Sequence, residues 1–255
     1  MMLLPSHIIV FNNSIPISTI FWFLGLAASL LLCFFHSRVR GFKVIEMFKI
    51  ALVGFLGALI GGRLGHVFQY WNHFLEYPVE VFYLHQGGMM YLAGLYGGLL
   101  AGVFYVRRRY DVLQILDLAA PSICLGHFFG RLGCFFYGCC YGIGVSVENS
   151  YLGYQFFGDD IMRYPTQLFS AFGLLILTLI LSWLYSKSLR KGSVFLTYLF
   201  LYSLMRFGVE FLRADERGVL FGIESLSPSQ ILSIGTIFLL IILIPSWIKG
   251  TSKTF

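Results

Sequence analysis

Charged side chains are the scarcest class of residue in this sequence, because aspartate, glutamate, lysine and arginine together make up only 12% of its 255 positions. Soluble domains usually carry about 25%. Hydrophobic residues make up 58% of the chain, so polar side chains are too few to cover a water-soluble globule of this size. Most of the surface must therefore face lipid. Because backbone polar groups in lipid have to be satisfied within the chain, we predict an all-α, polytopic membrane protein.

Two further absences and the net charge narrow the function. No basic residue precedes the first apolar run and no small-residue cleavage site follows it, so we predict no cleavable signal peptide. No internal two-fold repeat of the kind found in many transporters is visible, which disfavours a transporter even though buried arginines also line anion paths. The formal net charge of +6 could suggest nucleic-acid binding, but basic cytoplasmic loops explain it more simply. We therefore expect no nucleic-acid partner.

Seven apolar segments can cross a membrane as helices of about 20 residues. The lysines and arginines of the loops between them place every second loop in the cytoplasm. We therefore predict a single membrane-embedded domain of residues 1–255, with its N-terminus outside and its C-terminus cytoplasmic. The polar residues 131–164 are expected to form a small extramembrane cap. The predicted spans are residues 17–35, 50–68, 87–106, 112–129, 165–185, 194–212 and 227–247.

Arginine is distributed unevenly across the predicted membrane. Twelve of the 18 lysines and arginines lie in predicted cytoplasmic loops, and the other six are all arginines in the outer half of the membrane or beyond it. A planar guanidinium binds phosphate through two parallel hydrogen bonds and keeps its charge when partly desolvated. We interpret this outer set as a site for a phospholipid head group. Its members are Arg63, Arg131, Arg163, Arg206, Arg213 and Arg217.

Three of these arginines, Arg63, Arg131 and Arg206, lie at or inside predicted spans. The structural alternative is that they pair with Glu210, with Asp117 or with backbone carbonyls. Arg206 and Glu210 are four residues apart and share a helix face, so some internal pairing is expected. Three arginines nevertheless outnumber the buried acids. The excess positive charge therefore predicts an anion site.

The stretch of residues 130–142 concentrates glycine and cysteine around Arg131. Glycine lets the backbone approach a ligand closely. The cysteines Cys134, Cys139 and Cys140 leave several alternatives open. Cys134 could form a disulfide with either of the others, all three could simply pack, or one could be a nucleophile with His127 as the nearest base. A metal site is disfavoured because a CxxC-type spacing is absent.

Six ordered motifs resemble one known family. They occupy residues 60–68, 86–89, 130–133, 163–169, 206–213 and 229–234. In this order, over roughly residues 50–245, they resemble bacterial prolipoprotein diacylglyceryl transferases. The ordered set is far more specific than any one motif.

The resemblance implies an enzyme of the bacterial cytoplasmic (inner) membrane whose active site faces the outer leaflet. It would transfer the diacylglyceryl group of phosphatidylglycerol to the lipobox cysteine thiol of a prolipoprotein signal peptide, as the first step of lipoprotein maturation. It implies neither cofactor nor metal. The implied catalytic residues are Arg131, Arg206 and Glu210. The implied substrate-binding residues are Arg131, Arg63, Gln86, Gly87, Gly88, Gly133, Arg163, Gln167 and Arg213.

The chain departs from the family pattern where protons would be handled. Leu92 stands where the family has a histidine, Cys134 and Cys139 stand at its asparagine and glutamate, and Leu24 replaces a tyrosine. Glu210 could serve as the base, as could two further candidates, Tyr91 and His85. The altered positions also keep two other functions open. One is a relative that uses the same lipid site for a different acceptor, and the other is a thiol-redox membrane protein using its three neighbouring cysteines.

Overall fold

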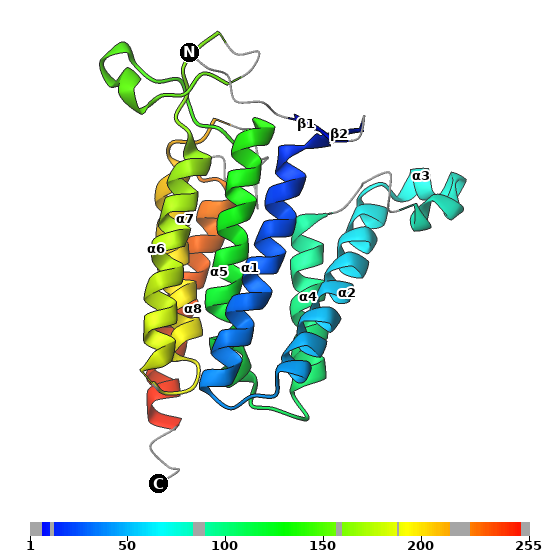
Figure 1. The fold of residues 1–255 in the computed structure, drawn as a ribbon, viewed down its shortest axis with the longest axis vertical. Helices are drawn as coiled ribbons and strands as arrows, with labels where there is room; N and C mark the ends of the chain where they lie inside the picture. The colour runs from blue at the N-terminus through cyan, green and yellow to red at the C-terminus, as the bar shows by residue number, and fades with distance from the viewer. Residues whose placement is uncertain are drawn as a thin grey trace. The chain divides into compact units, whose positions relative to one another are not determined.

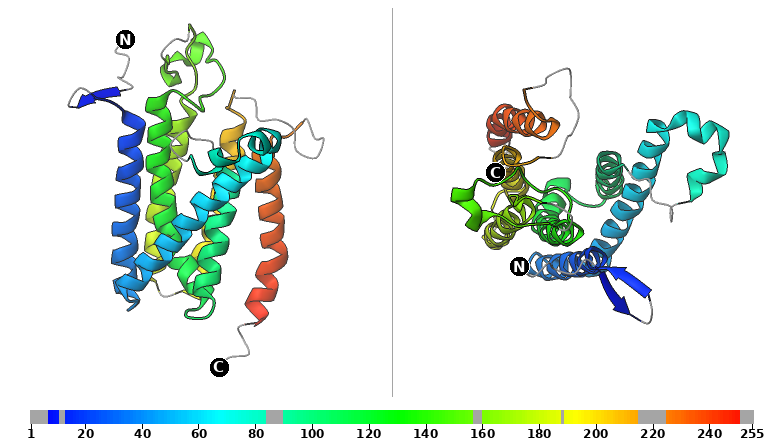
Figure 2. Two further views of the ribbon diagram at one scale, coloured as in Figure 1. Left: turned by 90° about the vertical axis from the view of Figure 1, so that its right-hand side faces the viewer. Right: turned by 90° about the horizontal axis from the view of Figure 1, so that it is seen from above.

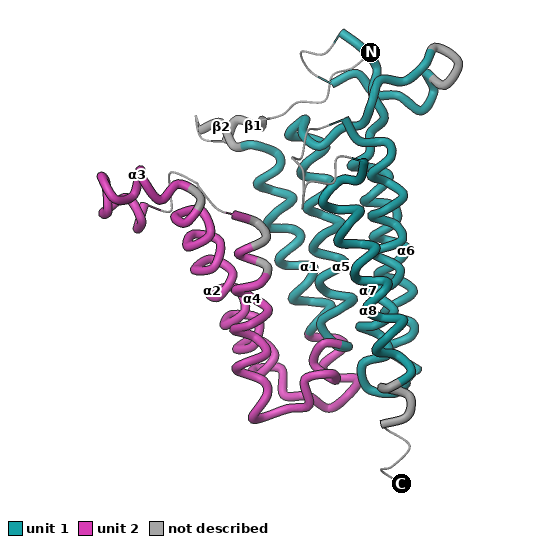
Figure 3. Tube along the Cα trace, turned by 180° about the vertical axis from the view of Figure 1, so that it is seen from behind, with its two compact units in different colours: residues 1–33, 117–255 teal, residues 34–116 magenta. Residues whose placement is uncertain are grey.

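A computed structural model describes residues 7–10, 13–83, 90–156, 160–187, 189–214 and 225–250 (Figure 1). The chain divides into two compact units (Figure 3). Unit 1 contains residues 1–33 and 117–255, and unit 2 contains residues 34–116. The first and fourth long helices of the chain each run through the boundary between these units.

Unit 1 is built from long helices whose directions alternate along the chain (Figures 1 and 2). Helix α7 packs against both α6 and α8. Because the directions alternate, the end of α5 and the starts of α6 and α8 lie at the same end of the unit as the end of α7. The helices are α1 (Ile17–Val39), α5 (Val112–Tyr137), α6 (Thr166–Ser186), α7 (Ser193–Glu210) and α8 (Pro228–Gly250).

The outward faces of these helices are apolar, as α6 illustrates. Phe172, Leu179 and Trp183 follow one another at helical spacing and are 67%, 64% and 59% exposed. Leu174 and Leu181 on the other face are completely buried. A helix that is hydrophobic on all sides is stable only in a large core or in lipid. The exposed aromatic and aliphatic stripe therefore fits contact with acyl chains.

Unit 2 consists mainly of α2 (Val44–Gln69) and α4 (Tyr91–Val106), which pack along their lengths. Between them lie the short helix α3 (Trp71–Glu76) and the 3₁₀ helix η1 (Pro78–Phe82). Glycines bring the two backbones together. A Cβ atom at Gly57 would lie 2.6 Å from the Gly97 carbonyl oxygen, and one at Gly61 would lie 3.0 Å from the Gly97 Cα. These glycines therefore allow close packing of α2 against α4.

Gly97→Leu should separate α2 from α4 because no room exists for a side chain at this contact. We expect a loss of at least about 1–3 kcal/mol of folding stability, seen as a lower unfolding temperature in detergent. Gly102→Leu is the matched control on the same helix, because a Cβ atom there meets nothing within 4 Å. Equal stability of the two variants would contradict the packing role of Gly97.

The helices confirm a multi-pass membrane protein. Within the described residues, α4 has 16 residues and α7 has 18, and neither reaches the length and hydropathy of a clear span. Five helices do: Ile17–Val39, Val44–Phe68, Val112–Tyr137, Thr166–Ser186 and Pro228–Pro245.

The predicted end of the fourth span at residue 129 is wrong. Helix α5 continues to Tyr137, so Arg131 lies on the helix and not in the expected cap. Gly133 does not break the helix because it lies against α1, where its Cβ would be 3.3 Å from the Ser18 carbonyl oxygen. Close packing on a neighbouring helix therefore compensates for the low helix propensity of glycine.

Helix α5 ends at Gly138, whose φ of +75° is in the left-handed region. The Gly138 N–H donates to the Phe135 carbonyl at 3.2 Å, and the Cys139 N–H donates to the Cys134 carbonyl at 3.2 Å. These two bonds form a Schellman motif, the common glycine-dependent helix end. The motif folds the chain back over the last turn of α5.

Two small features lie outside the α-helices. An antiparallel hairpin of β1 (His7–Val10) and β2 (Asn13–Pro16) precedes α1, which the all-α prediction did not include. Beyond α5, the 3₁₀ helix η3 (Val147–Leu152) is followed by a backbone pairing of Tyr154 with Arg163. The second feature lies in the segment where the cap was expected.

Candidate functional site

The functional face of α5 carries His127, Arg131 and Cys134. Their spacing of four and three residues places them along one side of the helix. The Arg131 Nε donates to the His127 Nε2 at 3.2 Å. This nitrogen of His127 is therefore an acceptor, which holds the Arg131 guanidinium in place.

The functional face of α7 carries Arg206 and Glu210, as their spacing predicted. The Arg206 Nη2 lies 2.8 Å from the Glu210 Oε2, and the side chains are only 12% and 4% exposed. The same Nη2 also donates to the Ser229 hydroxyl at 2.9 Å, which comes from the first turn of α8. The Arg206 Nη1 is buried and has no hydrogen-bond partner in the described part of the chain. One donor is thus left for a ligand.

These two faces meet at a single pocket. Arg131 and Arg206 both line it, and Arg213 lies within electrostatic range of Arg206. The Glu210 carboxylate pairs with Arg206, and Arg131 lines the same pocket. Two guanidinium groups at one pocket suit an anion such as a phosphodiester. Its lining is His127, Arg131, Ser170, Leu174, Tyr202, Met205, Arg206 and Val209.

Asp117 makes its described hydrogen bonds at the start of α7, far along the helices from Arg131 and Arg206, so its proposed pairing with these two arginines is wrong. Its two carboxylate oxygens accept hydrogen bonds from the Gly192 N–H at 2.6 Å and the Phe195 N–H at 2.8 Å. These donors lie at the start of α7, about 20 Å along the helix from Arg206 at 1.5 Å per residue. Asp117 instead satisfies the free N–H groups of that helix end.

Asp117→Ala should destabilise the protein without affecting the arginine pocket. Two charge-assisted hydrogen bonds are lost, and a buried helix terminus is left unsatisfied. We expect a loss of about 1–3 kcal/mol, measured by thermal unfolding. Asp117→Asn keeps an acceptor oxygen and should lose much less. A pocket-dependent activity that fell in the folded Asp117→Ala protein would contradict the separation of the two sites.

Arg63 binds backbone carbonyl groups within unit 2, as the structural alternative predicted. Its Nε donates to the Val81 carbonyl at 2.8 Å, its Nη2 donates to the Glu80 carbonyl, and its guanidinium lies 5.4 Å from the centre of the Phe74 ring. Arg63 thus ties η1 to α2. Its role in substrate binding stays a prediction.

Two further predicted site residues support the segment that follows α5. The Arg163 guanidinium lies over the Tyr141 ring at 4.9 Å. Gln167 is completely buried, and its Nε2 donates to the Cys139 carbonyl at 2.6 Å. Gln167 therefore contacts the segment after α5 that contains Cys139 and Cys140, and it does not line the arginine pocket.

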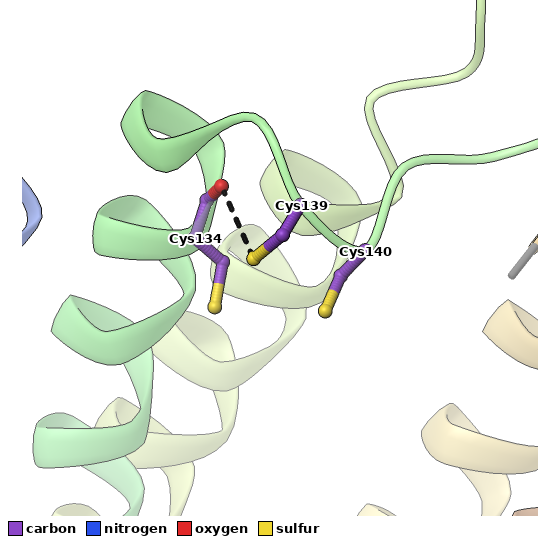
Figure 4. A group of neighbouring side chains, drawn as sticks. All are labelled: Cys134, Cys139 and Cys140. Carbon is purple, nitrogen blue, oxygen red and sulfur yellow. Dashed lines mark hydrogen bonds between the residues drawn. The ribbon is translucent and has the colours of Figure 1, made fainter. Parts of the chain in front are cut away.

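The three cysteines converge, which the sequence alone did not indicate. The sulfur atoms of Cys134, Cys139 and Cys140 all lie within 4.8 Å of one another (Figure 4). All three are free thiols. Hydrogen bonds from the Cys134 and Cys139 thiols, and then from Arg213, lower the pKa of Cys140. A hydrogen bond between Cys139 and the Cys134 thiol raises the pKa of Cys139. The signal that could have revealed the cluster is Gly138 as a helix-ending residue.

Several predicted residues fall where no side chain is described. His85, Gln86, Gly87 and Gly88 lie outside the described residues, and Tyr91 is described only as the first residue of α4. Their assigned roles stay predictions. Sequence reasoning assigned no role to Ser229, although this residue lies in the last of the six family motifs.

Comparison with known proteins identifies relatives over most of the chain. The family model described as "Prolipoprotein diacylglyceryl transferase" matches residues 8–246. The chain is 35% identical over 222 residues to the phosphatidylglycerol–prolipoprotein diacylglyceryl transferase of Clostridium tetani, which covers 85% of this chain and 86% of the relative. It is 32% identical over 217 residues to enzyme 2 of that name from Clostridium perfringens, covering 83% and 82%. The enzyme of Idiomarina loihiensis is 35% identical over 175 residues, covering 67% and 65%.

Proposed function

Since the chain belongs to the prolipoprotein diacylglyceryl transferase family, we propose that it transfers the diacylglyceryl group of phosphatidylglycerol to the lipobox cysteine thiol of a prolipoprotein signal peptide. This reaction is the first step of lipoprotein maturation. The observation that carries the site assignment is the convergence of Arg131 and Arg206 on one pocket, with a buried Arg206 donor that has no partner in the described chain.

The phosphate of phosphatidylglycerol is bound between Arg131 and Arg206. The acceptor thiolate uses an electron pair to form a C–S bond with the terminal glyceryl carbon. The C–O bond between this carbon and the phosphate breaks, its electrons stay on the phosphate oxygen, and glycerol phosphate leaves. Guanidinium groups already in position stabilise the charge that develops on that oxygen.

Neighbouring residues hold the two arginines for this task. Glu210 and Ser229 fix one edge of Arg206 and leave its Nη1 for the lipid. His127 fixes the Nε of Arg131. Arg213 adds positive charge to the same end of the unit.

The enzyme acts as a single domain in the bacterial cytoplasmic membrane, with its active site towards the outer leaflet. The seven-span arrangement adds α4 and α7 to the five clear spans, with the N-terminus outside and the C-terminus cytoplasmic. Lys187, Arg190 and Lys191 connect α6 to α7 at the end of unit 1 opposite Arg131. A basic loop on that side supports a cytoplasmic position for this end of unit 1 and an outer-leaflet position for Arg131.

The function is tested by reconstituting the purified protein in vesicles and supplying a lipobox peptide. We expect thioether-linked diacylglyceryl peptide and free glycerol phosphate only when phosphatidylglycerol is present, detected by mass spectrometry. A peptide with serine in place of the acceptor cysteine is the matched control. Complementation of a transferase-deficient bacterium separates this function from lipid transfer to another acceptor. Failure of both assays with stable, folded protein would contradict the proposal.

A further inference from the structure

Three thiols gather at the end of α5, beside the arginine pocket. Cys134 lies on the last turns of the helix, and Cys139 and Cys140 lie just after the Schellman turn. The three sulfur atoms lie within 4.8 Å of one another (Figure 4), and the three residues are half-buried. Cys139 also points its thiol at the Cys134 carbonyl, at 3.8 Å.

The backbone of the segment that carries these thiols has an uncommon conformation. Cys140 has a φ of +65°, an uncommon conformation for a residue with a side chain. Two buried residues at the start of α6 hold the loop: the Thr166 hydroxyl donates to the Cys140 carbonyl at 2.7 Å, and the Gln167 amide donates to the Cys139 carbonyl at 2.6 Å. Strained backbone held by buried partners is typical of functional sites.

A second observation indicates a missing ligand. Gln167 is completely buried, and its Oε1 has no hydrogen-bond partner in the described part of the chain. An unpaired buried carbonyl oxygen is unfavourable, and such groups usually meet a water or a ligand. Because the other end of this amide holds the Cys139 carbonyl, the free oxygen lies next to the thiol cluster.

The spacing of the sulfur atoms suits a metal better than a disulfide. A disulfide joins two sulfurs at about 2.05 Å and would leave the third unpaired. Three thiolates around one zinc ion at about 2.3 Å lie about 3.8 Å apart. The observed separations, all within 4.8 Å, are close to this value. Three protein ligands with one open position is the pattern of catalytic zinc sites, whereas structural sites are closed by four.

The surrounding charge also favours a metal thiolate centre. Three thiolates and one Zn²⁺ carry a net charge of −1, and a thiolate from outside would increase it to −2. Arg213 hydrogen-bonds the Cys140 thiol, and Arg131 lies within electrostatic range of Cys134. These two guanidinium groups offset the excess negative charge.

The position of the cluster matches the need for an activated thiol. Cys134 is three residues from Arg131 on the same helix face, where side chains are about 5–6 Å apart. The acid–base groups described around the pocket are already engaged, because His127 accepts from Arg131 and Glu210 pairs with Arg206. A metal ion would ionise the incoming thiol without either of them, since a coordinating thiol loses its proton.

We propose that Cys134, Cys139 and Cys140 bind one zinc ion whose open fourth position takes the acceptor cysteine as a thiolate, next to the arginine-bound phosphate. The inference rests on the proposed function. The thiol releases its proton to solvent when its sulfur binds zinc. That sulfur then forms the C–S bond to the glyceryl carbon, glycerol phosphate leaves with the C–O electron pair, and zinc does not change oxidation state.

The first test measures metal in the full-length protein purified without chelators. We expect one zinc per chain by elemental mass spectrometry after loading and desalting. Cys134→Ser, Cys139→Ser and Cys140→Ser should each weaken zinc binding more than about 100-fold, because removing a ligand exceeds the 10–100-fold effect of altering its supporting residues. Cys33→Ser, outside the cluster, is the matched control. Stoichiometric zinc that all three variants retain, no zinc in the wild type, or a disulfide within the cluster would each overturn the proposal.

The second test uses the wild-type protein, so it does not depend on the folding of a variant. Cobalt replaces zinc, and thiolate-to-cobalt charge-transfer absorption reports the number of bound sulfurs. A lipobox peptide should increase this absorption, whereas its serine counterpart should not. An identical spectrum with both peptides would overturn the role of the open position.

Activity then separates this inference from the proposed function. Stripping the metal should abolish thioether formation by the wild type, and zinc should restore it. Full transfer by the metal-free protein would overturn the zinc role while supporting the transferase. A peptide-dependent cobalt spectrum without any transfer from phosphatidylglycerol would overturn the transferase function and would still support the thiol-binding metal site.

Discussion

Arg206→Ala should reduce diacylglyceryl transfer by at least about 100–1,000-fold, the usual loss when one donor to a developing oxyanion is removed. Arg206 is held by Glu210 and Ser229, and its Nη1 is the donor that the described chain leaves free. Arg131→Ala should have an effect of similar size. Initial rates of thioether formation in phosphatidylglycerol vesicles measure both variants.

We expect diacylglyceryl transfer to require the planar guanidinium of Arg206 and not only its positive charge. Arg206→Lys cannot donate to Glu210, Ser229 and a phosphate through one planar group, so we expect only a small recovery over alanine. Arg190→Ala is the control, because it removes an exposed arginine from the opposite end of unit 1. Wild-type rates for Arg206→Ala, in protein that unfolds at the wild-type temperature, would refute the phosphate site.

Glu210→Gln should have the second large effect, because it leaves the buried guanidinium of Arg206 without its carboxylate partner. Removing one member of a buried ion pair costs about 3–5 kcal/mol. Part of this loss should appear as lower thermal stability and part as slower transfer, since Arg206 then adopts other positions. We expect a decrease in transfer of about 100-fold, measured in vesicles together with the unfolding temperature.

A double substitution distinguishes the positioning role of Glu210 from a role as the base. If Glu210 acts through Arg206, then adding Glu210→Gln to Arg206→Ala should lower transfer little further, because the partner is already gone. If it accepts the thiol proton itself, the two losses should multiply. Multiplicative losses would therefore contradict the positioning role.

The comparison of sequence with structure shows where short-range patterns are sufficient. The Arg206–Glu210 pair followed from a spacing of four residues on one helix, and the structure contains it. This pair depends on neighbours within about one helical turn, which the sequence displays directly.

Other predictions failed or remained open because they depend on distant residues. The helix break expected after residue 129 is absent, since Gly133 is supported by α1, more than 100 residues earlier in the chain. Asp117 was a possible partner of the arginines, but the N-terminus of α7 lies next to its carboxylate. Asp117 therefore accepts hydrogen bonds from the N–H groups at that helix end. Neither outcome can be read from local spacing.

The sequence by itself determined that the chain is a helical membrane protein and that its family is one that handles a phospholipid. Composition determines whether the surface of a chain faces water or lipid. Ordered motifs can be recognised in the sequence without a structure. Only the tertiary structure decided that Arg131 and Arg206 share a pocket and that three cysteines form one cluster. Those contacts join residues from different helices or across a sharp turn, and their geometry depends on how the helices pack and on how the loop after α5 is held by α6.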